Sequence, residues 1–172
     1  DMGFIGDIRK IVDLTPITRQ TLMFSATLEG GQVEALAQDL LNNESRSLTL
    51  APPRGVAGNI QQTVYLADNE DHKQALLKSL ITRSEIKQAL VFVASRKQVD
   101  TWVQFVRGLG IMCDGLHGEL PQGERTARLK RMRRGRLKVI VATDVAARGL
   151  DLLDISHVIN LHLPRRGDIY VH

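Results

Sequence analysis

The sequence predicts an α/β fold built on a doubly wound parallel sheet, and two patterns carry that prediction. From Ile60 onward, short apolar runs alternate with helical patterns, which is the order of elements in proteins with parallel sheets. The run Val139–Ala142 is apolar at every position, as is typical of a strand that is buried on both faces. With 172 residues, of which 43% are hydrophobic, the chain can supply a core for one domain or slightly more.

The first part of the chain predicts a helix, a strand, a second helix and a short strand. Apolar residues recur at helical spacing over residues 5–12, before Pro16, and again over residues 33–41. Between these helices we expect a strand over residues 21–24, and a short one over residues 48–50. Strand, helix and strand in this order form the repeating unit of a parallel sheet.

Residues 51–58, with the sequence APPRGVAG, predict a linker between two bodies, residues 1–50 and residues 59–172. The two prolines stiffen the first half of this segment, and the two glycines loosen the second half. An ordinary surface loop is the alternative.

The second part predicts a regular alternation of strands and helices. We expect strands near residues 62–66, 89–93, 111–116, 139–142 and 157–161. Helices are expected over residues 70–82, through the segment that contains Trp102, and from about Pro121. Trp102 shares an apolar stripe with its helical neighbours, so we expect it in the core rather than stacked on a base.

The charge pattern favours a polyanionic partner. The net charge is +4, and the segment Arg125–Lys138 holds eight Lys or Arg residues and no acidic residue. A solvated helix face is the alternative. Cys113 is the only cysteine, which excludes an intramolecular disulfide and fits a reducing cytoplasmic location. No run reaches the roughly 18 apolar residues of a membrane helix, and no histidine spacing suggests a protein-held metal.

The junction after residue 142 is the strongest candidate for a ligand site. Thr143 and Asp144 follow a buried strand, and ligands of open α/β sheets bind at the carboxyl ends of strands. Small residues keep the following turn thin, while Arg148 offers a planar cation and Asp151 an acceptor for ribose hydroxyls. Taken alone, the stretch also fits an ordinary strand followed by a small-residue turn.

This stretch, ATDVAARGLD, resembles motif V of the DEAD-box RNA helicases, which belong to helicase superfamily two. Four further segments match motifs of that family in the same order: FSAT at residues 24–27, VFVASR at 91–96, the QxxR pair Gln122 and Arg125, and YVH at 170–172. The stretches DMGF and QTLMFSATLEG are most similar to bacterial members. The resemblance implies the end of a first RecA-like domain over residues 1–50 and most of a second over residues 59–172.

The resemblance also implies site residues. Those expected to contact the RNA backbone are Ser95, Arg96, Gly118, Gln122, Arg125 and Thr143. Gln122 lies one helical turn before Arg125 and is expected to orient it, whereas His117 fits a structural role as well as a binding one. Gly149 and Asp151 are expected to bind ATP, and Arg148 and His172 to lie between the domains. Ser25 and Thr27 are expected to couple ATP hydrolysis to unwinding. The alternative is that Ser-Ala-Thr is only the end of a strand.

The implied function is that of an ATP-dependent RNA helicase, with ATP as cofactor and RNA as partner, in ribosomal or mRNA complexes. The chain carries neither a GxxxxGK[ST] phosphate loop nor an Asp-Glu-Ala-Asp stretch, so we expect an internal fragment that is inactive alone, with Mg²⁺ held elsewhere in the parent protein. A noncatalytic RNA-binding scaffold and an unrelated nucleotide-binding enzyme are the alternatives. His162 departs from the family pattern, which has an aspartate there.

Overall fold

The computed structural model describes residues 4–25, 32–42, 44–48, 60–147, 155–164, 167 and 170. The chain divides into two compact units, Asp1–Pro52 and Pro53–His172. The predicted linker at residues 51–58 lies outside the described residues, and the predicted domain limits remain a prediction.

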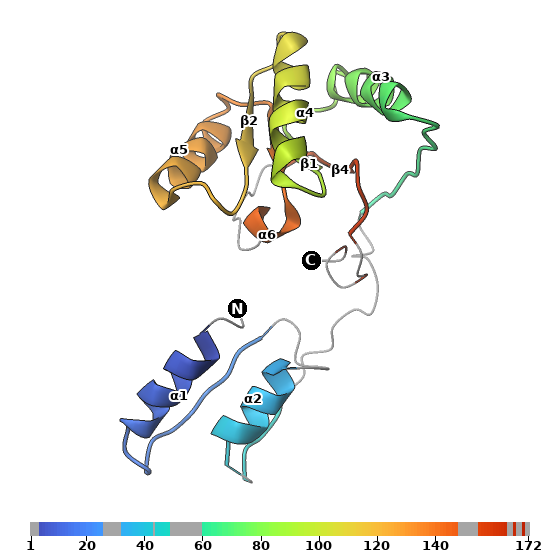
Figure 1. Ribbon diagram of the computed structural model, residues 1–172. Helices are drawn as coiled ribbons and strands as arrows, with labels where there is room; N and C mark the ends of the chain where they lie inside the picture. Colours follow the sequence, from blue (N-terminus) through green and yellow to red (C-terminus); the bar gives the residue numbers. More distant parts are fainter. Residues whose placement is uncertain are drawn as a thin grey trace. The chain divides into compact units, whose positions relative to one another are not determined.

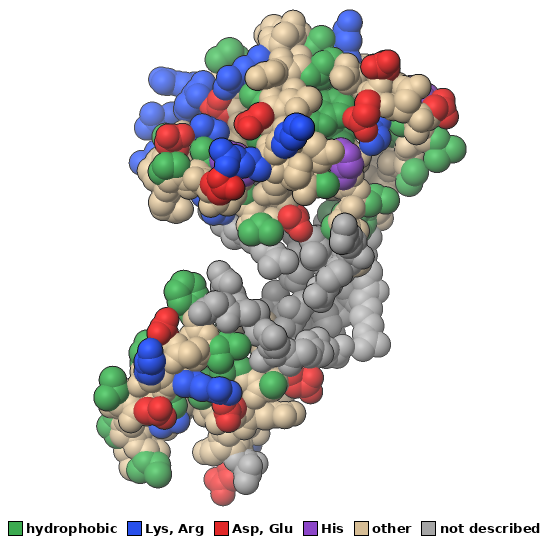
Figure 2. Space-filling model, viewed as in Figure 1, with side chains coloured by type: hydrophobic (Ala, Val, Ile, Leu, Met, Phe, Trp, Pro, Cys, Tyr) green, Lys and Arg blue, Asp and Glu red, His purple; other side chains and the backbone are tan. Residues whose placement is uncertain are grey.

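The first unit contains two helices, α1 (Ile5–Asp13) and α2 (Gln32–Leu40). An ion pair joins them, with 2.7 Å between Arg9 Nη2 and Asp39 Oδ2. None of the residues of α1 is buried, and hydrophobic side chains lie on the face of this unit that Figure 2 shows. Both predicted helices are therefore present, and no described residue of this unit is fully buried.

The predicted strand over residues 21–24 is wrong, because the structure assigns no strand there and leaves Phe24 91% exposed. The predicted strand over residues 62–66 is also wrong, and Val64 and Leu66 are almost fully exposed. Apolar and β-branched residues give a segment local propensity, but a strand exists only when a neighbour pairs with its backbone. The predicted strand over residues 48–50 falls mostly outside the described residues.

The second unit is a parallel four-stranded sheet in the order β2-β3-β1-β4 (Figure 1). Its strands are β1 (Ala89–Phe92), β2 (Cys113–Leu116), β3 (Val139–Ala142) and β4 (His157–Asn160). Its helices are α3 (Glu70–Ile81), α4 (Arg96–Gly108), α5 (Gln122–Arg133) and α6 (Asp144–Ala147). The predicted α/β class with a parallel sheet is confirmed.

Both faces of this sheet are buried, which explains why its strands lack polar alternation. Ala89 and Val91 of β1 pack in one cluster with α3 and α4, whereas Leu90 packs in a second cluster with α5 and α6. Successive side chains of a strand point to opposite faces, so each central strand contributes side chains to both clusters. Helices on both faces make the sheet doubly wound.

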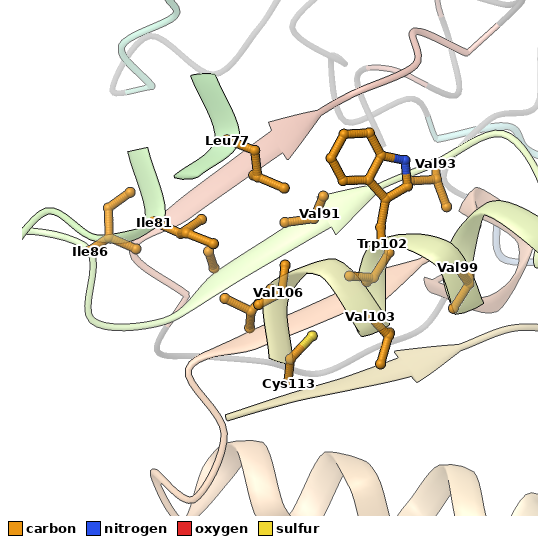
Figure 3. Packing of buried hydrophobic residues seen from close by; sticks show 13 residues of the cluster. Leu77, Ile81, Ile86, Val91, Val93, Val99, Trp102, Val103, Val106 and Cys113 are labelled. Carbon is orange, nitrogen blue, oxygen red and sulfur yellow. The ribbon is translucent and has the colours of Figure 1, made fainter. Parts of the chain in front are cut away.

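Trp102 lies inside the cluster between the sheet and the helices α3 and α4 (Figure 3). It is 3% exposed, and its ring meets Phe105 edge-on with 5.6 Å between centroids. Its predicted place in the core is confirmed. Cys113 belongs to the same cluster, and its burial raises the pKa of the thiol to about 12.

Candidate functional site: a cleft at the carboxyl edge of the sheet

Three loops form a cleft of about 280 Å³ where the central strands end. They follow β1, β2 and β3, whose last residues Phe92, Leu116 and Ala142 lie level in the sheet register. The lining residues are Ala94, Ser95, Arg96, His117, Gly118, Glu119, Thr143, Asp144 and Val145. Parallel strands end at one edge, which is why segments 24 or more residues apart meet here. Of the six residues predicted to contact RNA, four line this cleft: Ser95, Arg96, Gly118 and Thr143.

The loop after β1 is held by a reciprocal cap at the start of α4. Ser95 Oγ accepts a hydrogen bond from the backbone N–H of Gln98 at 3.4 Å. In return, the carboxamide oxygen of Gln98 accepts a hydrogen bond from the backbone N–H of Ala94 at 3.1 Å. Serine followed three residues later by glutamine is a capping pattern that satisfies the exposed donors of a helix start. The cap therefore fixes the backbone that presents Arg96.

Arg96 and Glu119 form an ion pair that joins the loops after β1 and β2. Both side chains are more than half exposed. Water screens such a pair, so it contributes roughly 0–1 kcal/mol. The guanidinium of Arg96 can therefore exchange this carboxylate for another anion at little cost.

Thr143 sits at the end of β3, half-buried in the cleft. Its backbone N–H donates to the carbonyl of Leu116 at 3.2 Å, and its carbonyl accepts from the N–H of Ala146 at 3.1 Å. No described residue forms a hydrogen bond with its hydroxyl. The backbone of Thr143 is thus fixed by two neighbours, while the hydroxyl can serve a ligand.

Gln122 and Arg125 lie on α5 and do not line the cleft. Arg125 Nη2 donates to the carbonyl of Ala146 at 2.6 Å, which ties α5 to α6 behind Thr143. The expectation that Gln122 orients Arg125 stays a prediction. Direct RNA contact by either residue remains a prediction.

The loop after β2 combines an unpaired ring nitrogen with open space. His117 Nδ1 is buried and has no hydrogen-bond partner among the described residues. Next to it, a methyl group added at Gly118 would meet no atom within 4 Å. A ligand backbone could approach closely at Gly118.

Two carboxylates also line the cleft: Asp144, which the sequence analysis placed at the candidate ligand junction, and Glu119, which it did not single out. Glu119 and Asp144 each follow directly after a predicted RNA-contacting residue, Gly118 and Thr143. Asp144 Oδ1 accepts a hydrogen bond from the backbone N–H of Val145 at 2.8 Å. With one arginine and two acids in its lining, the cleft is not strongly basic. The sequence shows an acidic residue directly after Gly118 and after Thr143, but the motif matches assign no role to either acid.

Most of the other predicted site residues lie outside the part of the chain that the structure describes. Ser25 is exposed on the first unit, and the predicted residues outside the described part are Thr27, Arg148, Gly149, Asp151 and His172. In the described part of the chain, no three His, Cys, Asp or Glu residues gather as metal ligands. No helix there is long and apolar enough to cross a bilayer.

Sequence comparison places this chain beside known helicases. Residues 72–172 match the family described as Helicase conserved C-terminal domain. The ATP-dependent RNA helicase SrmB of Escherichia coli strain K12 is 43% identical over 172 residues, which is 100% of this chain and 38% of that protein. The SrmB of Haemophilus influenzae is 39% identical over 171 residues, which is 99% of this chain and 39% of that protein. The chain thus spans less than half the length of these relatives.

Solved structures agree with the sequence comparison. The crystal structure of E. coli DEAD-box protein SrmB bound to regulator of ribonuclease activity A is similar with a TM-score of 0.59 and 47% identity, covering 62% of each chain. The RNA helicase Prp28 from Chaetomium thermophilum, bound to ADP, gives a TM-score of 0.60 at 29% identity, covering 100% of this chain and 40% of that one. The RecA-like form of the sheet is shared with these neighbours.

Proposed function

This chain belongs to the DEAD-box RNA helicases of bacterial type, and we propose that its cleft binds single-stranded RNA through the sugar-phosphate backbone. One observation carries the proposal: three loops distant in sequence bring Arg96, Gly118 and Thr143 to one surface. A cation, an accessible backbone and a hydroxyl are the groups that hold a phosphate chain without reading its bases.

Each group has a distinct part in this binding. Arg96 exchanges the carboxylate of Glu119 for a phosphate, and a bidentate guanidinium suits that anion. The Thr143 hydroxyl donates to a neighbouring phosphate oxygen, and Gly118 lets the chain approach closely. Among the lining residues only His117 carries a ring, so base stacking contributes little and binding is independent of sequence.

The two carboxylates of the cleft make this binding weak. Glu119 and Asp144 repel phosphates, so only a few phosphates can be neutralised by cations near the cleft. With about three phosphates engaged, the slope of log K against log salt is near −2 for a single strand. Low affinity for RNA suits a protein that must release RNA in every cycle of ATP hydrolysis.

For the whole protein we propose ATP-dependent opening of short RNA duplexes, with RNA in ribosomal or mRNA complexes as partner and the cytoplasm as location. ATP, with Mg²⁺ held outside this chain, supplies the free energy of phosphoryl transfer. Gly149 and Asp151 are proposed for the ribose edge, and Arg148 and His172 for the domain interface. Ser25 and Thr27 are proposed to couple hydrolysis to unwinding. These roles rest on the family resemblance.

Removal of one hydroxyl tests the cleft. Thr143→Val keeps the shape of the side chain but removes the donor, and the full chain should lose about 1 kcal/mol of binding to a single strand, roughly fivefold in Kd. Thr101→Val is the matched control, since Thr101 lies on α4 and its hydroxyl donates to the Lys97 carbonyl instead. Equal effects of the two substitutions, or none, would count against the cleft.

A further inference from the structure

We infer that a second surface, at the far end of α5 from the cleft, binds the phosphates of double-stranded RNA. We call it the amino-edge surface, and it consists of Lys130, Arg134, Arg136 and Lys138. All but Lys138 are exposed, and Lys138 is half-buried. Lys and Arg side chains gather on the α5 side of the second unit (Figure 2). The inference rests on the proposed function only for the identity of the nucleic acid as RNA.

In the described part of the chain, no acidic side chain pairs with the cations of this surface. The other cations of the segment have partners: Arg128 pairs with Glu124 at 3.0 Å, and Arg131 with the buried Asp114 at 2.5 Å. By contrast, no carboxylate of the described residues forms an ion pair with Lys130, Arg134, Arg136 or Lys138. The segment itself contains no acidic residue between Arg125 and Lys138. Such a concentration of positive charge attracts a polyanion.

A rigid turn presents these side chains. Gly135 adopts a φ of +67° at the end of α5, a conformation that favours glycine. The N–H of Arg136 donates to the carbonyl of Arg131 at 2.9 Å, and the N–H of Arg134 to the carbonyl of Lys130 at 3.1 Å. Gln88 Nε2 also donates to the carbonyl of Met132 at 2.6 Å, which fastens the turn to the segment before β1. A fixed backbone lowers the entropy lost on binding.

The amino-edge surface is separate from the cleft. Lys138 precedes β3 and Thr143 follows it, so the two lie five residues apart along a strand. At about 3.3 Å per residue, they are roughly 16 Å apart, at opposite edges of the sheet. One phosphate group therefore cannot contact the amino-edge surface and the cleft at the same time.

The surface fits a duplex better than a single strand. Residues 117–142 contain no Phe, Trp or Tyr, so this part of the chain offers no platform for unpaired bases. Duplex RNA hides its bases and displays two lines of phosphates, which Lys and Arg side chains can contact without base stacking. A duplex adjoining the strand in the cleft could reach this surface.

Salt-dependent binding of the full chain tests the inference. Anisotropy is measured with a single strand of about ten nucleotides and a blunt duplex of about 16 base pairs. Over about 50 to 200 mM salt, Arg134→Gln with Arg136→Gln should flatten the duplex slope by about 1.8, from two lost phosphate contacts, and leave the single-strand slope unchanged. Arg134→Lys with Arg136→Lys keeps the charge and should keep the duplex slope.

Lys78→Gln with Arg83→Gln is the matched control, because it removes the same charge from the exposed end of α3. An unchanged duplex slope in the Gln double variant would overturn the inference, as would an equal loss in the control or on both RNAs. Thr143→Val separates the two proposals, since it should weaken only the single strand. If it weakens neither RNA while the duplex effect persists, the cleft assignment fails and the amino-edge surface stands.

Discussion

The side chains of Gln98 and His162 meet between the loops after β1 and β4, with 3.1 Å between their Nε2 atoms. An amide nitrogen can only donate, so His162 Nε2 must accept, and the ring is neutral with its proton on Nδ1. Gln98 is also the residue whose carboxamide oxygen holds the N–H of Ala94 in the cleft. The histidine that departs from the family pattern is therefore connected to the loop that presents Arg96.

This contact predicts a loss of stability in mild acid. Burial, and then Lys73, lower the pKa of His162 from its usual 6.5, while Glu70, paired with Lys73, opposes them. A lowered pKa means that the unfolded chain binds the proton more readily, so this contribution is present above pH 6.5 and is lost as the pH falls below it. Urea unfolding across that range should show the decline in the wild type.

His162→Asn should remove that part of the pH dependence, whereas His157→Asn, at an exposed histidine of the same unit, should keep it. Two outcomes would show that the neutral ring is not what holds Gln98. One is a wild-type unfolding free energy that stays constant between pH 7 and the lowered pKa of His162. The other is a decline that persists in His162→Asn.

Glu119→Gln should strengthen RNA binding. The substitution releases Arg96 and removes one negative charge from the cleft. Because an exposed ion pair contributes roughly 0.2–1 kcal/mol, we expect single-stranded RNA to bind about 1.4- to fivefold more tightly. Anisotropy at fixed salt measures the change. Glu124→Gln is the control, since Glu124 pairs with Arg128 outside the cleft; an equal gain there would point to net charge alone.

Gly118→Ala should separate binding from folding. The added methyl group meets no atom within 4 Å, so the unfolding free energy should stay within about 0.5 kcal/mol of the wild type. The same methyl group would stand where the RNA backbone approaches, and we expect affinity to fall roughly fivefold, or about 1 kcal/mol. Unfolding and anisotropy are measured on the same variant. If Gly118→Ala binds RNA with the affinity of the wild type, Gly118 is not part of the binding surface.

Gly115→Ala should destabilise the second unit. A methyl group there would lie 2.5 Å from Val99 Cγ1 and 3.3 Å from Val103 Cγ2, where α4 packs on β2. Valine has few alternative rotamers, so the backbone must shift, at a cost of about 1–3 kcal/mol. Gly123→Ala on the exposed side of α5 should be neutral or stabilising. Equal unfolding midpoints for the two variants would contradict the packing argument.

The sequence predicted the second unit well because its signals are local. Val139–Ala142 is apolar at every position since both faces of β3 are buried, and the apolar stripe that contains Trp102 marks α4 in the same way. The strands expected over residues 21–24 and 62–66 were wrong, because pairing is not encoded in the segment itself. Register and pairing depend on residues distant in sequence.

For the cleft, the motif matches identified Ser95, Arg96, Gly118 and Thr143, which the strand ends bring together. They did not identify Glu119 or Gln98, whose roles depend on side-chain geometry. The expected orientation of Arg125 by Gln122 stays a prediction. Helical spacing shows which residues are neighbours, but not which hydrogen bonds their side chains form.

Mapping the RNA contact on the full chain by NMR tests the central claim most directly. When a single strand of about ten nucleotides is added, the cleft predicts that amide shifts change together in the three loops at Ala94–Arg96, His117–Glu119 and Thr143–Val145. The amides of α3 should stay unchanged, and those at residues 130–138 should change little. Shifts confined to residues outside the three loops, or absent from the loop that contains Thr143, would contradict the account.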